Sequence, residues 1–67
     1  MRKELREWLE RERPEIAALL DACEKHPGLA DMLLCFSPSD IHPDPEARKE
    51  IVREFEKLDL EVIFVKK

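Results

Sequence analysis

A stripe of apolar residues at helical spacing runs through the first third of the chain, and a proline interrupts it. Its residues are spaced by three, four or seven positions, as on the buried side of an amphipathic helix. Its members are Leu5, Trp8, Leu9, Ile16, Leu19, Leu20 and Cys23. A proline inside a helix removes a backbone hydrogen bond at a cost of about 3 kcal/mol, whereas the first helical position tolerates it. Because Pro14 divides the stripe, we predict two helices, Arg2 to Glu12 and Pro14 to Lys25.

The alternative is one kinked helix across residues 2–25. The unbroken phase of the stripe favours it, and so does the absence of Gly, Ser, Asp or Asn at the junction. Such a helix would be about 35 Å long. It would overhang a domain of 67 residues, and its apolar end would then need a partner.

Two short apolar segments predict strands. Met32 to Phe36 is a continuous apolar run that stops at Ser37, as in a strand that is buried on both faces. A third short helix that begins at Pro27 is the alternative for this part of the chain. Leu60 to Val65 is rich in the β-branched and aromatic residues that favour strands.

A further helix is predicted between these two segments. Asp44 is a candidate N-cap, and Pro45 suits the first helical position. We expect the helix to end near Leu58, and to bury Ala47, Ile51, Val52, Phe55 and Leu58.

The order helix, helix, strand, helix, strand predicts a single small α/β domain over residues 1–67. A strand-helix-strand unit crosses over with a right hand and makes its strands parallel. Met32 to Phe36 should therefore pair with Glu61 to Val65 in a two-stranded parallel sheet, with the last helix on one face and the first two on the other. Both edges of this sheet stay open, and Lys66 and Lys67 would discourage pairing there with other chains.

Charged side chains are abundant, and uncharged polar side chains are nearly absent. Asp, Glu, Lys and Arg make up 42% of the chain, its net charge is -4, and it contains no Asn, Gln, Thr or Tyr. Because hydroxyls and amides usually orient a bound ligand, we expect neither catalysis nor a cofactor. The negative charge disfavours nucleic acid as a partner. No apolar run has the length of a signal peptide or a membrane span, so we expect a cytoplasmic protein, or a recombinant one if the chain is synthetic.

Four residues have the right chemistry for a zinc site. They are Cys23, His26, Cys35 and His42, and thiolates with imidazoles suit tetrahedral zinc. Cys23 and His26 have C-x2-H spacing, but the other two lack the close spacing of a zinc finger. We therefore expect two reduced core thiols and two histidines at the ends of loops.

The turn-forming segment after the first predicted strand also contains residues that could act in catalysis. Cys35, Ser37 or Ser39 could serve as nucleophile, with His42 as base and Asp40 to orient it. No glycine-rich loop or cofactor motif accompanies them. Serine, aspartate and proline are common in any such turn, so we expect a structural role for these residues.

The last third of the chain resembles computationally designed α/β mini-proteins. Asp44, Pro45 and Glu46 open a helix that is saturated with Glu, Lys and Arg, and Leu60 to Val65 is filled with strong strand formers. The resemblance is one of style, so it implies an idealised fold and no functional residue. The first half departs from this style at its cysteines, its histidines and the uncapped junction before Pro14.

These observations predict a non-catalytic designed scaffold or protein-interaction module. It would bind itself or a designed target through its sheet edges or its N-terminal helix, and strand addition at an edge needs only main-chain hydrogen bonds. The candidate interface residues are Trp8, Leu5, Val62 and Phe64. One alternative is a natural cytosolic accessory subunit that needs a protein partner, and another is a Cys/His zinc or thiol site.

Overall fold

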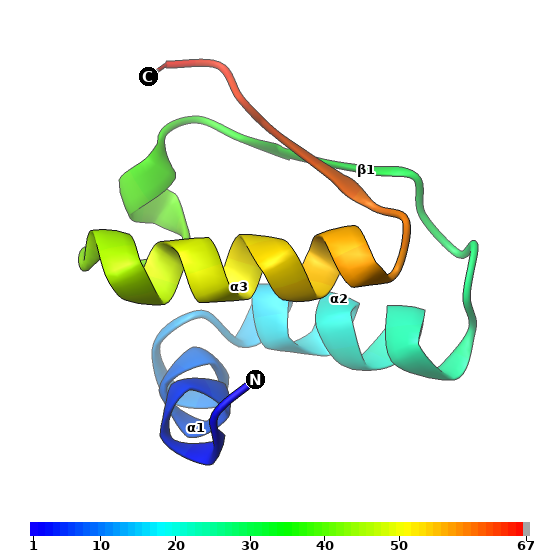
Figure 1. The fold of residues 1–67 in the computed structure, drawn as a ribbon, viewed down its shortest axis with the longest axis horizontal. Coiled ribbons are helices and arrows are strands. Elements are labelled where there is room, and N and C mark those ends of the chain that lie inside the picture. Colours follow the sequence, from blue (N-terminus) through cyan, green and yellow to red (C-terminus); the bar gives the residue numbers. More distant parts are fainter. Residues whose placement is uncertain (67) are drawn as a thin grey trace.

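The computed structural model describes residues 1–66 and has the predicted order of helices and strands. Its elements are α1 (Lys3–Glu12), α2 (Pro14–Lys25), β1 (Met32–Cys35), the short 3-10 helix η1 (Pro38–Asp40), α3 (Pro45–Lys57) and β2 (Glu61–Phe64). Figure 1 shows the two strands at the top of the view, with α3 and α2 beneath them and α1 at the bottom. The chain is therefore a small α/β domain.

The apolar stripe forms two helices, as predicted, and not one kinked helix. Arg13 separates them with φ -137° and ψ 65°, which is not helical backbone. Pro14 then occupies the start of α2, where its missing N–H costs nothing. Arg13 also fixes the junction through its side chain, because Nε donates a hydrogen bond of 2.8 Å to the carbonyl oxygen of Asp40.

The strands β1 and β2 pair in parallel, which confirms the prediction from their order. Met32 lies beside Glu61 and Cys35 beside Phe64. Further backbone hydrogen bonds extend the pairing beyond these ends, since the N–H of Val65 donates to the carbonyl oxygen of Cys35 at 2.9 Å and that of Lys66 to the carbonyl oxygen of Phe36 at 2.7 Å. Residues 26–29 form a turn and not a third helix. Lys67, which we expected to protect the sheet edge together with Lys66, lies outside the described residues.

Helix α3 begins at Pro45, as expected, but its cap differs from the prediction. Asp44 occupies the N-cap position with no hydrogen bond from its side chain to the helix. Its backbone N–H instead donates to Nδ1 of His42 at 2.9 Å. The helix ends at Lys57 with Leu58 as its C-cap, close to the expected end, and Asp59 reverses the chain with φ 59° before β2 begins.

The core lies between the helices and one face of the sheet. Its buried residues are Leu5, Leu9, Ile16, Ala17, Leu20, Cys23, Cys35, Ile41, Ala47, Ile51, Phe55 and Leu60. Leu33, Val62 and Phe64 pack against this core from the sheet. All three helices lie on the same side of the strands (Figure 1).

The predicted burial of both sheet faces is therefore wrong. Along β1 the side chains alternate, so that Met32 and Leu34 are exposed while Cys35 is buried. The first two helices pack beside α3 instead of crossing to the far face, because all three apolar helix stripes meet in one core. A continuous apolar run does not by itself distinguish a strand covered on both faces from one covered on a single face.

Ion pairs connect α1 to both of the other helices. Nε of Arg2 lies 3.1 Å from Oε1 of Glu50 in α3, and Nη2 of Arg6 lies 3.0 Å from Oε1 of Glu24 in α2. These side chains remain between 28% and 62% exposed, so water screens the ion pairs and each contributes little free energy. Within residues 1–66, no helix has the combined length and apolar character needed to cross a bilayer.

Candidate interaction surface

The uncovered face of the two-stranded sheet is the main exposed apolar surface. It consists of Met32, Leu34 and Ile63 in the strands, together with Phe36 and Val65 directly after them, and we call it the open sheet face. Met32, Leu34, Phe36 and Val65 have between 53% and 66% of their surface exposed, and Ile63 is half-buried. Because Leu34 is the register partner of Ile63, side chains from the two strands form one continuous patch. Monomeric soluble proteins seldom expose large contiguous patches of this kind.

The predicted interface residues do not lie on this face. Leu5 has only 5% of its surface exposed and belongs to the core. Val62 and Phe64 are half-buried and pack against the core from the covered side of the sheet. Since successive strand residues point to opposite faces, Val62 and Phe64 lie on the face of β2 opposite to that of Ile63.

Trp8, the remaining predicted interface residue, is engaged in a contact within the chain. Its ring centroid lies 3.9 Å from that of His42, with 40° between the ring planes. The guanidinium carbon of Arg13 lies 5.5 Å from the Trp8 centroid, within the range of a cation–π interaction. The cluster of Trp8, Arg13 and His42 therefore joins α1 to the loop that precedes α3.

The surroundings of His42 favour the neutral form of its imidazole. Burial is the main factor that lowers the pKa of His42 below its ordinary value of 6.5. The positive charges of Arg13, Arg48 and Arg2 lower it further, whereas Asp44 opposes them. The backbone N–H of Asp44 donates to Nδ1 of His42, and protonation of that nitrogen would replace the acceptor with a second donor.

We expect the free energy of unfolding to fall as the pH decreases below 6.5 because of His42. The unfolded chain takes up the proton first, so acid favours unfolding until the folded state is protonated as well. Glu50 and Glu54 have their pKa values lowered from 4.5, mainly by hydrogen bonds from Arg2 and Lys57 respectively, so their contributions are lost only at lower pH. When the free energy of unfolding is measured with urea between about pH 5 and 6.5, its change with pH therefore reports on His42.

Two variants test whether His42 causes this dependence of the unfolding free energy on pH. His42→Gln should remove most of the slope of unfolding free energy against pH in that window. His26→Gln changes an exposed histidine at the end of α2 and should retain the slope. Equal slopes in the wild type and His42→Gln would contradict the assignment.

The residues considered for catalysis form a local turn. The carboxylate of Asp40 accepts a hydrogen bond of 3.0 Å from the backbone N–H of Ser37, and the hydroxyl oxygens of Ser37 and Ser39 lie 2.9 Å apart. Within the described residues, no hydrogen bond joins Asp40 to His42. Burial, and secondarily the charge of Asp40, raises the pKa of the Cys35 thiol, so this thiol stays protonated and is a weak nucleophile.

The four zinc candidates are dispersed over the fold. Cys23 and Cys35 are free thiols that are both buried in the core, while His26 is exposed and His42 stacks on Trp8. Over residues 1–66, no three His, Cys, Asp or Glu side chains lie close enough to share a metal ion.

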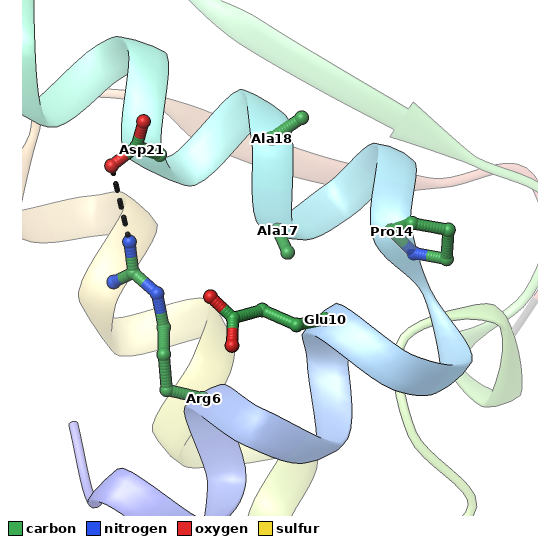
Figure 2. A pocket seen from close by; sticks show the side chains of 6 residues that line it. All are labelled: Arg6, Glu10, Pro14, Ala17, Ala18 and Asp21. Atoms are coloured by element: carbon green, nitrogen blue, oxygen red, sulfur yellow. Dashed lines mark ion pairs between the residues drawn. The ribbon is translucent and has the colours of Figure 1, made fainter.

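A shallow groove between α1 and α2 has a volume of about 420 Å³. Figure 2 shows its lining residues, which are Arg6, Glu10, Pro14, Ala17, Ala18 and Asp21. Nη2 of Arg6 lies 3.6 Å from Oδ1 of Asp21 across the groove, in addition to its contact with Glu24. Arg6 is the one cationic residue in the lining, and the carboxylates of Asp21 and Glu24 already neutralise its charge. The groove therefore has little capacity to bind an anion.

Sequence reasoning missed the open sheet face. The one signal for it is Glu61, a charged residue at the start of an otherwise apolar strand. Residues 61, 63 and 65 share a face of that strand, so Glu61 marks the face of Ile63 and Val65 as the one in contact with water.

No protein-family model matches this chain, and no curated protein or solved structure is detectably similar to it. The open sheet face is thus identified from its geometry and exposure alone.

Proposed function

We propose that this chain is a non-catalytic protein-interaction module and that the open sheet face is its binding surface. The observation that carries the proposal is the exposure of four large apolar side chains on one face of a two-stranded sheet. Burying such side chains releases roughly 25 cal/mol per Å² of apolar surface. The face has no hydroxyl or amide with which to orient a small ligand, so an apolar protein surface is the partner that suits it.

A designed scaffold and a natural accessory subunit would both use this surface. The style of α3 and β2 favours a designed origin. The open sheet face, in contrast, is what a subunit that depends on a partner would present. In either case the interaction takes place on the sheet face and not at the N-terminal helix, because Leu5 is buried and Trp8 is engaged with His42.

Site-specific photocrosslinking in living cells tests this proposal. Benzoylphenylalanine replaces Phe36 on the open sheet face in one sample, and Leu29 in the other. Leu29 is a suitable control because it is 59% exposed, similar to the 64% of Phe36, but lies in the turn before β1. We expect discrete crosslinked bands from position 36 and none from position 29. No bands from either position, or equal bands from both, would overturn the proposal.

A further inference from the structure

A groove between α3 and β2 combines an apolar floor with a positively charged rim. Its volume is about 300 Å³, and we call it the α3–β2 groove. Val52 and Phe64 form the floor, because both are half-buried and pack against the core. The rim consists of the cationic residues Arg48, Lys49 and Arg53 and the carboxylate of Glu56. Positive charge therefore predominates here, although the net charge of the whole chain is -4.

The positive charges of this rim are not neutralised within the described residues. Across residues 1–66, no ion pair involves Arg48, Lys49 or Arg53. Main-chain oxygens hold Arg48 in place, because its Nε donates to the carbonyl oxygen of His42 at 3.1 Å and its Nη2 to that of Pro43 at 3.3 Å. A neutral carbonyl positions a guanidinium but leaves its charge uncancelled. The α3–β2 groove can therefore attract negative charge, unlike the groove between α1 and α2.

The size of the α3–β2 groove and the spacing of its cations favour a peptide as ligand. Pockets that bury most of a drug-sized molecule have volumes from about 300 Å³ upwards, so this groove lies at the lower limit for such a ligand. Lys49 and Arg53 are four residues apart in α3, which corresponds to about 6 Å along the helix axis. Alternate residues of an extended peptide are about 6.6 Å apart. Two carboxylates at alternate positions of a peptide therefore match the spacing of the two cations.

We infer that the α3–β2 groove binds an acidic peptide segment of a partner protein, in an extended conformation in which acidic and apolar residues alternate. The apolar side chains lie against Val52 and Phe64. The carboxylates point the opposite way in an extended chain, where they meet the long side chains of Lys49 and Arg53 that reach outward into water. The fixed charge of Arg48 adds to this complementarity. The inference goes beyond the proposed function, because Phe64 points away from the open sheet face.

Fluorescence anisotropy with three synthetic peptides tests the inference. The probe is Glu-Leu-Glu-Leu-Glu, and all three peptides carry the same fluorescein label. We expect saturable binding to the purified chain at low ionic strength, and weaker binding as salt is added. Replacing each Leu of the probe with Ser removes the apolar contact and should weaken binding at least about tenfold, and Lys-Leu-Lys-Leu-Lys should not bind. No saturable binding of the probe, or equal binding of all three peptides, would overturn the inference.

Two double variants with the same change in charge locate the site. Lys49→Gln with Arg53→Gln removes two cations of the rim and should raise the dissociation constant of the probe about five- to twentyfold. Lys25→Gln with Arg11→Gln makes the same exchanges at side chains that are 69% and 65% exposed and lie outside the groove, so the constant should stay within about twofold. All four residues are exposed, so both variants should fold. Equal weakening by the two double variants would mean general attraction to positive charge and would refute a site in the groove.

A variant of the open sheet face separates this inference from the proposed function. Phe36→Ala should leave the affinity for the probe unchanged, because its side chain lies outside the α3–β2 groove. Loss of binding in Phe36→Ala would place the peptide on the open sheet face and rule out the groove. Crosslinks from position 36 depend on the open sheet face alone, so each proposal can fail while the other stands.

Discussion

Replacing Phe55 with alanine is expected to unfold much of the protein at room temperature. Phe55 is the largest side chain that is fully buried, and it lies in α3 at the centre of the core. Truncation of a buried phenylalanine costs about 3–5 kcal/mol, because transfer free energy is lost and a cavity remains. A chain of 67 residues has a total stability of roughly 3–10 kcal/mol, so this single change removes most of it.

Phe36→Ala is the matched control for Phe55→Ala. Phe36 is 64% exposed, so its truncation should change the stability of the monomer by no more than about 0.5 kcal/mol. Both variants are compared with the wild type by urea unfolding, followed by circular dichroism at the same protein concentration. Equal midpoints for Phe55→Ala and the wild type would contradict the core described above.

Replacing Ile41 with alanine is expected to cost about 2–5 kcal/mol, which is the cost of a core residue and not of a loop residue. Ile41 follows η1 in a connecting segment and yet has 0% of its surface exposed. Its backbone N–H donates to the carbonyl oxygen of Pro38 at 3.1 Å, so the turn directs this side chain into the core.

Ile51→Ala provides the comparison for Ile41→Ala. Ile51 is the same residue type, is also 0% exposed, and lies in the middle of α3. The free energies of unfolding of the two variants, obtained from urea unfolding, should agree to within about 1 kcal/mol. A cost below about 0.5 kcal/mol for Ile41→Ala, typical of a surface position, would show that the loop does not contribute to the core.

Local rules predicted the helices and strands of this protein well. The position of Pro14 determined where α1 ends, because its ring and its missing N–H restrict it to the start of α2. Similarly, the order of the elements was enough to predict a parallel pair of strands. The first inference depends on a few neighbouring residues, and the second depends only on the order of the elements along the chain.

Properties that depend on packing between distant elements were not predictable in this way. The run from Met32 to Phe36 is apolar at every position, so alternation gave no indication of which face the helices cover. Ile41 lies within a polar turn segment, and only the folded chain shows that it is buried. Likewise the contact between Trp8 and His42 joins residues far apart in the sequence, which no local pattern could reveal.

The parallel pairing of β1 and β2 also determines when the open sheet face comes into existence. Leu34 and Ile63 are neighbours across the sheet but are separated along the chain by the whole of α3. Contacts between residues so distant in sequence form late, because the entropy of closing the intervening loop must be overcome first. We therefore expect the two halves of the apolar patch to stay apart during folding until α3 has docked. An apolar surface that is completed only late in folding would give partly folded chains little opportunity to aggregate through it.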